Sequence, residues 1–324
     1  MRKVLLLVCL ILGFGAQAQL VVTNNQTPSQ LVQDVLLGDG VTVSNVKFNG
    51  SFANANLIRD QAARFNGGLV AGIGIDSGVV LATGQATFVT GPNANFPSSL
   101  ESNTAIVGDV DLQILAGSNS VTKSAVLEFD FIPTGEDLSF DFAFASKEYP
   151  VFAPPQNYGY NDAFGFFLSG PGINGTFSNQ AINIALVPGT TSYVTINNVN
   201  PVTNATYFVS NPVGAPGVNY GGFTVVIPAQ ATVQCGEVYH IKLAIGNVSD
   251  NGYDSAVFLK ANSFSTTPIN LGGDLTVEAG TALCAEDTYE LCTGLDVAIP
   301  HQWYRDDIAI PGATSPCYTV VENG

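Results

Sequence analysis

The chain has 324 residues, a formal net charge of −16 and only 11% charged residues, so uncharged polar residues must supply most of its solubility. This acidity argues against anionic partners such as nucleic acid. It suits divalent cations, and it equally suits a solvated surface on an exported protein.

The first eighteen residues have the pattern of a secretory signal peptide. Arg2 and Lys3 give a basic start, residues 4–14 are apolar, and residues 16–18 (Ala-Gln-Ala) form a small-x-small cleavage site. The apolar stretch is too short to cross a bilayer, and no later stretch is long and apolar enough. The sequence therefore predicts a secreted or cell-surface protein. Its net charge changes from −16 to −18 once Arg2 and Lys3 are removed.

One segment near the N-terminus predicts a helix from Asn54 to Phe65, within ANANLIRDQAARFNGG. Its apolar residues fall on one helical stripe: Leu57, Ile58, Ala62 and Phe65. Gly67 is placed to adopt the left-handed conformation that commonly ends a helix. We expect this helix to pack against a sheet.

Strands dominate the rest of the first 265 residues. Four segments alternate apolar and polar residues with a period of two, as strands with one face in a core do: VLEFDFIP, DLSFDFAFAS, GFTVVIP and YHIKLAIGN. Asn-Gly pairs at 49–50, 174–175 and 251–252 are turn signals. Together they predict an all-β fold, an antiparallel β-sandwich of jelly-roll or lectin-like type with one packed helix.

A domain boundary is expected after Phe264. We divide the chain into a signal peptide (1–18), a β-sandwich domain (19–265), a polar linker (266–273) and a partial module (274–324). The last segment resembles an immunoglobulin-like module, with Trp303 as its core aromatic. The sequence stops before such a module completes its strands, so we expect further C-terminal domains.

Four cysteines follow the signal peptide: Cys235, Cys284, Cys292 and Cys317. An exported chain permits disulfides, and three of these cysteines lie in the C-terminal module. Any bridge there belongs to that module, and its pairing is left open. Cys235 stands apart and is interpreted as a free, buried thiol.

The motifs between residues 54 and 264 resemble the choice-of-anchor L domain of bacterial surface proteins. The likeness rests on ANANLIRDQAARFNGG with GIDSGVVLATG, LEFDFIPTGEDLSFDFAFASKEYP, YNDAFGFFLSGPGINGT and CGEVYHIKLAIGNVSDNGYDSAVFLKANSF, in that order. Family members commonly read Glu-Glu-Tyr where this chain has Lys147-Glu148-Tyr149. The resemblance implies an exported surface protein with a variable C-terminal anchor, often a type IX secretion sorting domain.

Acidic and amide side chains border the apolar strands in YNDAFGFFLSG and SDNGYDSAVFLKANSF. Strand ends meet at the rim of a sandwich, and calcium needs six to eight oxygen ligands. The candidate ligands are Glu148, Asn161, Asp162, Asp250 and Asp254. The alternative is that they are turn and surface residues, since Asp and Asn favour such positions without any ligand. Asp109 and Asp111 pose the same choice, and we place them on a solvated loop.

Aromatic residues gather in the Pro-rich stretch EYPVFAPPQNYGYND: Tyr149, Phe152, Tyr158 and Tyr160. Exposed aromatic rings on a sandwich stack on sugars, so this loop is a candidate glycan-binding surface. The alternative is a loop folded back on itself, with its rings forming a small satellite core.

These features predict a non-catalytic surface protein for adhesion or ligand capture, with an extracellular glycan or surface protein as partner and calcium as a stabilising ion. The alternative is an exported polysaccharide-active hydrolase that uses a carboxylate pair drawn from Glu128, Asp130, Glu148 and Asp162. Neither His240 nor His301 stands beside a G-x-S-x-G elbow, so a serine hydrolase is not expected.

Overall fold

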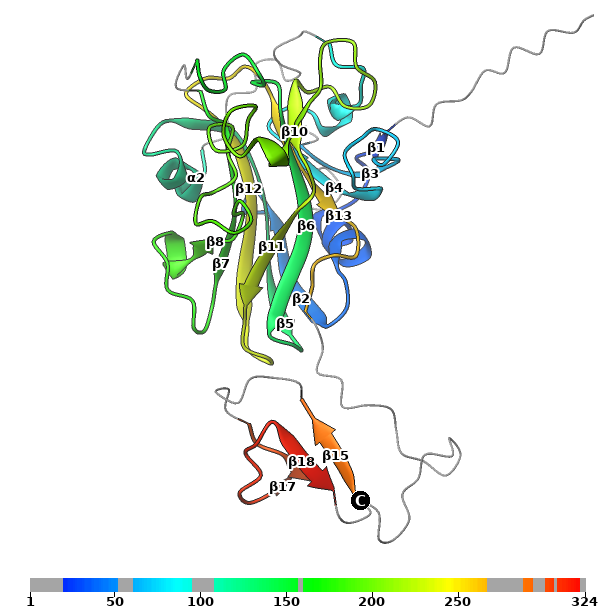
Figure 1. Ribbon diagram of the computed structural model, residues 1–324, viewed down its shortest axis with the longest axis vertical. Helices are drawn as coiled ribbons and strands as arrows, with labels where there is room; N and C mark the ends of the chain where they lie inside the picture. Colours follow the sequence, from blue (N-terminus) through cyan, green and yellow to red (C-terminus); the bar gives the residue numbers. More distant parts are fainter. Residues whose placement is uncertain are drawn as a thin grey trace, which may run out of the picture.

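The computed structural model of the chain (Figure 1) describes residues 20–51, 61–94, 108–156, 160–266, 288–293, 301–305 and 308–320. The described residues between 20 and 266 form two packed antiparallel sheets, of nine and five strands. The predicted mostly-β, antiparallel, sandwich-like fold is confirmed. The expected signal peptide lies outside the described residues. Among those described, no helix is long and apolar enough to cross a membrane.

The larger sheet has the strand order β1-β3-β4-β13-β6-β10-β9, and β11 and β14 also pair with β6. Its strands are β1 (Val21–Thr23), β3 (Ala62–Asn66), β4 (Ser77–Ala82), β6 (Asp137–Ser146), β9 (Phe208–Ser210), β10 (Gly222–Thr224), β11 (Ile227–Thr232), β13 (Ser255–Lys260) and β14 (Ser265–Thr266).

The smaller sheet has the order β2-β5-β12-β7-β8. Its strands are β2 (Val41–Phe48), β5 (Val121–Pro133), β7 (Ala163–Ser169), β8 (Ile182–Asn183) and β12 (Tyr239–Val248). The alternating segments predicted as strands correspond to β5, β6 and β12. The fourth segment, GFTVVIP, is divided between two strands: β10 ends at Thr224 and β11 begins at Ile227.

The main core lies between the two sheets and is rich in phenylalanine. Alternate residues of β5 and β6 point into it, where Phe140 and Phe142 both pack against Phe166 with ring centroids 4.9 Å apart. Rings at this spacing combine large apolar burial with favourable edge-to-face geometry. The inward residues explain the period of two in the sequence.

The predicted helix from Asn54 to Phe65 is wrong over its described part. Residues 52–60 lie outside the described residues, but Ala62–Asn66 forms strand β3, paired with β1 and β4. Ala63 and Phe65 are buried on the outer face of the larger sheet, where the Phe65 ring meets that of Phe258 at 5.2 Å. Pairing with distant strands overrides the local helical pattern.

Short helical turns and loops cover the outer faces of both sheets. The described helical elements are α1 (Pro28–Gln30), η1 (Leu31–Leu36), η3 (Ala86–Val89), α2 (Val110–Leu115), η4 (Ser178–Gln180) and η5 (Ala205–Tyr207). Leu112 of α2 and Phe177 beside η4 belong to an apolar cluster on the smaller sheet. Asp109 caps α2 by accepting hydrogen bonds from the backbone N–H groups of Asp111 and Leu112.

Long loops gather at one end of the sandwich, the upper end in Figure 1, where β6 and β12 finish and β7 and β13 begin. We call this the loop end. It is formed by residues 147–156, 160–162, 211–221 and 249–254, with 91–94 beside them. Backbone hydrogen bonds join Gly91 to Gly217 and Asn93 to Ala215. The loop end is therefore held by pairing between segments that are distant in the sequence.

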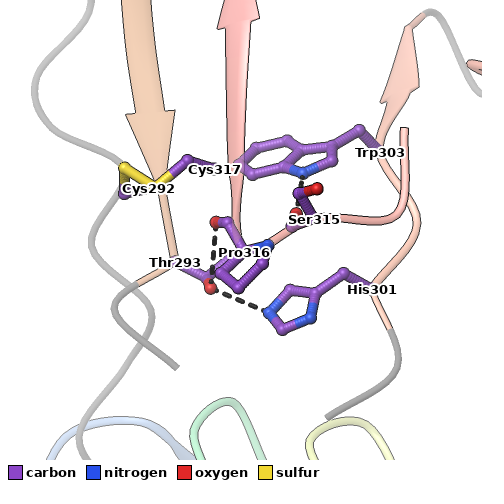
Figure 2. Close-up of a disulfide and its surroundings, with 7 residues drawn as sticks. All are labelled: Cys292, Thr293, His301, Trp303, Ser315, Pro316 and Cys317. Carbon is purple, nitrogen blue, oxygen red and sulfur yellow. Dashed lines mark hydrogen bonds between the residues drawn. A yellow bond between two sulfur atoms is a disulfide. The ribbon is translucent and has the colours of Figure 1, made fainter. Parts of the chain in front are cut away.

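The C-terminal residues form a small two-sheet module. One sheet pairs β15 (Tyr289–Cys292) with β18 (Cys317–Val320), and the other pairs β16 (Tyr304–Arg305) with β17 (Ile308–Ala309). Cys292 and Cys317 face each other across the first sheet and form a disulfide (Figure 2). The bridge thus belongs to this module. Cys235 is exposed, so the expected burial of this thiol is wrong.

Trp303 lies beside this disulfide rather than on a strand (Figure 2). Its indole N–H donates to the carbonyl of Ser315, and its ring lies 5.8 Å from that of Tyr318. Next to Cys292, the Thr293 hydroxyl is hydrogen-bonded to the His301 ring. The immunoglobulin-like identity of the module stays a prediction.

Candidate functional site

Two buried carboxyl groups meet at the loop end. Glu148 follows β6 and Asp162 immediately precedes β7, and both side chains are fully buried. The backbone N–H of Asp162 donates to Glu148 Oε2 at 3.2 Å. We call these two residues the carboxylate pair. Their contact joins the segment that follows β6 to the acid-bearing segment that precedes β7.

Asp162 also connects the two sheets. Its Oδ1 accepts from the backbone N–H of Val248 at 3.0 Å, and its Oδ2 accepts from the Ser255 hydroxyl at 2.7 Å. That hydroxyl lies 2.8 Å from the hydroxyl of Ser146. One side chain thus joins β12 of the smaller sheet to β13 and β6 of the larger one. Neither serine's role could be inferred from its neighbours in the sequence.

Burial changes the acidity of the pair. The pKa of Glu148 is raised to about 8, chiefly by desolvation and also by the charge of Asp250, although the hydrogen bond from Asp162 opposes this rise. Desolvation also raises the pKa of Asp162, and the charge of Glu148 adds to this. Two adjacent carboxylates cannot both be ionised cheaply in a buried site. The pair therefore binds a proton or a cation more readily than exposed acids do.

The remaining candidate ligands lie around the pair. The Asp250 carboxylate accepts from Gly252 N–H at 3.0 Å, and its pKa is raised by desolvation. Asn161 Oδ1 accepts from Asn197 N–H at 3.1 Å. Asp254 is 2% exposed; burial lowers the pKa of the nearby Lys147, and the charge of Asp254 opposes this. Most of these oxygens already accept hydrogen bonds from the protein.

The acids do not form a compact cluster of several carboxylates. Among the described residues, the only set of three His, Cys, Asp or Glu ligand atoms within 4.8 Å of one another is Glu290, Cys292 and Cys317. Those two cysteines are joined in the disulfide, so that set offers one free ligand. Calcium binding at the loop end stays a prediction.

Two buried oxygens at the loop end have unused acceptor capacity. Glu148 Oε1 and Asn247 Oδ1 are buried without a hydrogen-bond partner. Asn247 donates through Nδ2 to the carbonyl of Gly252 at 2.7 Å, so it contacts the turn that carries Asp250. Unpartnered buried oxygens are rare and costly. A proton on Glu148 or a bound cation would satisfy the first of them.

The aromatic loop folds back onto the domain. Tyr149 is 2% exposed and donates its hydroxyl to the carbonyl of Val199, so its expected exposure is wrong. Phe152 packs edge-on against Tyr160 at 5.3 Å and Tyr253 at 4.7 Å. These three rings form a satellite cluster, as the alternative interpretation of this loop expected. Tyr158 lies outside the described residues.

A pocket of about 210 Å³ opens beside this aromatic cluster. We call it the rim pocket. Its walls include Lys147, Pro150, Val151, Pro212, Val213 and Tyr253. Val151 and Val213 are 59% and 65% exposed, an unusual position for apolar side chains. Tyr149 forms part of the lining although it is otherwise buried.

A second polar group lies on the outer face of the smaller sheet. His240 Nδ1 lies 2.7 Å from Asp130 Oδ1, and its Nε2 lies 3.4 Å from Glu128 Oε2. The hydrogen bond with His240 lowers the pKa of Glu128. Desolvation would raise the pKa of Asp130, but hydrogen bonds from Asn45 and His240 outweigh it and lower the pKa. We call Glu128, Asp130 and His240 the outer-face cluster.

Beside this cluster, Lys242 Nζ binds Asp109 and Asp111 at 2.7 and 2.6 Å. Asp111 is 1% exposed and lies in the first turn of α2, so the expected solvated loop at these two acids is wrong. Lys242 lies on β12, far from both acids in sequence, and no local pattern indicated its role.

The comparisons with known proteins were made on the whole chain. The model of the choice-of-anchor L domain matches residues 20–265, which is more than half of the chain. A search of curated proteins found no match. The chain therefore belongs to the choice-of-anchor L domain family.

Proposed function

We propose that this protein captures an extracellular glycan at the rim pocket and does no chemistry on it. The family implies an exported, surface-anchored bacterial protein. The observation that carries the proposal is the rim pocket itself, a concave site at the loop end with exposed apolar side chains, two prolines and a tyrosine in its walls. Ligand sites commonly combine such apolar walls with a few polar groups.

The pKa shifts of the buried and outer-face carboxylates favour a non-catalytic role over the hydrolase alternative. A glycosidase needs one carboxylic acid that stays protonated as a general acid. Both carboxylates of the outer-face cluster have a lowered pKa, which suits ion pairing with His240. The carboxylate pair has raised pKa values, but both side chains are fully buried. A buried pair is better suited to holding the fold.

An array of extracellular polysaccharides, probed with residues 20–324, tests this function. We expect binding without release of reducing sugar. Val213→Trp, which places a bulky ring at the exposed wall of the pocket, should reduce binding at least about tenfold, the equivalent of about 1.4 kcal/mol. Turnover that disappears in Glu128→Gln or Asp130→Asn would instead support a hydrolase.

A cation at the carboxylate pair is the second part of the proposal. Glu148 Oε1 and the Asp250 carboxylate would supply charged ligands, and Asn247 Oδ1 lies against the same turn. Calcium prefers such oxygen ligands, and its charge would relieve the repulsion between the acids.

Calcium should therefore raise the melting temperature of the chain and a chelator should lower it. Free calcium at 100 times its Kd stabilises a folded protein by about 2.7 kcal/mol. Glu148→Gln and Asp250→Asn should each remove the difference in melting temperature between calcium and chelator. The control variant Asp141→Asn, on the outer face of the larger sheet, should keep this difference. Equal melting temperatures with calcium and chelator would refute this part of the proposal.

A further inference from the structure

The walls of the rim pocket are fixed before any ligand arrives. Asn93 Nδ2 donates to the carbonyl of Asn211 at 2.7 Å, and Gly214 N–H donates to the carbonyl of Asn93 at 2.9 Å. Asn211 in turn donates to the carbonyls of Val218 and Tyr220. The wall formed by residues 210–213 is thus pinned by side-chain amides. A pinned wall loses little conformational entropy on binding.

The charge of the pocket is opposite in sign to that of the chain. Among the described residues of the lining, Lys147 is the only charged one, although the chain as a whole carries a net charge of −16. Burial lowers the pKa of Lys147, and the charge of Asp254 opposes this. A lysine ammonium has three N–H donors, so it can bind a ligand oxygen in addition to its interactions within the protein.

The rest of the lining suits a sugar ring. Tyr253, Pro150 and Pro212 present flat or rigid apolar groups, and Tyr253 is held by its packing against Phe152. The volume of about 210 Å³ is below the roughly 300–1,000 Å³ of sites for drug-sized ligands. The pocket therefore has room for one residue of a polymer, with its neighbours passing over the exposed valines.

We propose that the rim pocket binds a carboxylate-bearing sugar residue of an acidic polysaccharide, with Lys147 holding the carboxylate. This inference rests on the proposed glycan-binding function and adds the chemical class of the ligand. A charge-assisted hydrogen bond from an ammonium to a carboxylate is about twice as strong as a neutral one. Lys147 is then the residue that distinguishes acidic from neutral sugars.

Calorimetric titration of residues 20–324 with trigalacturonate and with neutral trigalactose tests the inference. The acidic sugar should bind at least about tenfold more tightly, and added salt should reduce this preference. Lys147→Met should abolish the preference while leaving the affinity for trigalactose within about twofold. Lys147→Arg should retain it. Lys260→Met, which removes an exposed positive charge from another face, should change nothing.

The ligand offers a control that does not depend on the folding of any variant. Methyl-esterified trigalacturonate has lost its charge and should bind the unaltered chain like trigalactose. Equal binding of the three sugars, or a preference that survives Lys147→Met, would overturn the inference and leave glycan capture standing. If neither these sugars nor the polysaccharide array show binding, the proposed function itself fails.

Discussion

At the scale of single residues, Asp162 is the most connected polar group of the loop end. Its two oxygens accept from Val248 N–H and the Ser255 hydroxyl, and both donors are buried. Removing the carboxyl group would leave Val248 N–H without a partner and leave the Ser255 hydroxyl with Ser146 alone, at about 1–3 kcal/mol for each lost hydrogen bond.

Asp162→Ala should therefore lower the free energy of unfolding by about 2–5 kcal/mol. Asp162→Asn should cost clearly less, because the amide oxygen still accepts from Val248 and Ser255 can reorient its hydroxyl. Urea unfolding of both variants measures this difference. Equal losses would mean that the charge of Asp162, and not its hydrogen bonds, matters to the fold.

His240 gives the outer-face cluster its pH dependence. Its hydrogen bond with Glu128 raises the pKa of His240 above 6.5, although desolvation opposes this. The stabilisation of the fold by protonated His240 is complete below pH 6.5 and is lost as the pH rises through the raised pKa of His240. The pKa values of Glu128 and Asp130 are lowered from 4.5 and 3.8, so their stabilisation is complete above those values. The stabilisation from these two carboxylates is lost as the pH falls through their lowered pKa values.

The cluster should thus stabilise the fold most between pH 4.5 and 6.5. The melting temperature of the wild-type chain should exceed that of His240→Gln by the largest margin in this range. The margin should shrink at higher and at lower pH. Thermal melts of the two proteins across the pH range measure it, and a margin that does not vary with pH would contradict the assignment.

At the scale of elements, α2 is attached to the smaller sheet by an ion pair. Desolvation would raise the pKa of Asp111, but hydrogen bonds from Lys242 and Ser178 outweigh it and lower the pKa. Removing one partner of such a pair leaves an uncompensated buried charge, which costs about 3–5 kcal/mol.

Lys242→Met should therefore destabilise the protein by about 3–5 kcal/mol in urea unfolding. The matched control is Lys260→Met, because Lys260 forms an exposed pair with Asp141 at 2.7 Å. Exposed pairs contribute about 0–1 kcal/mol, so this second change should have little effect. Similar losses in the two variants would show that the Lys242 pair is not effectively buried.

The sequence predicted some elements better than others for a physical reason. Strands β5, β6 and β12 alternate because one face of each is buried in the main core, and that periodicity can be seen locally. Strand β3 buries Ala62 on one face and Ala63 and Phe65 on the other, so its apolar residues do not alternate and fit a helical stripe equally well. Only its pairing with β1 and β4 decides its structure.

The acidic residues of the loop end could be predicted from the sequence, but the residues that contact them could not. Turn chemistry and acid-then-strand motifs identified Glu148 and Asp162 from local sequence. Ser255 is 93 residues from Asp162 and Lys242 is 133 residues from Asp109, so no local pattern could join them. The exposure of Tyr149 was misjudged for the same reason, because Tyr149 is buried by contacts with distant segments such as Val199.

At the scale of the whole molecule, two packed sheets carry the proposed binding site on the loops at one end. The sheets enclose a phenylalanine-rich core, and the outer faces are covered by loops, short helical turns and ion pairs. The loop end combines the buried carboxylate pair with an open pocket. Loops on a rigid sandwich are a common place for binding sites. The central claim is that ligands bind at this end.

Hydrogen–deuterium exchange of residues 20–324, with and without saturating trigalacturonate, tests that claim most directly. Bound sugar should slow exchange in peptides that cover residues 147–151 and 210–213, since these segments line the rim pocket. Peptides from β5 and β12, which carry the outer-face cluster, should be unchanged. Protection confined to β5 and β12, or no protection anywhere, would contradict the account.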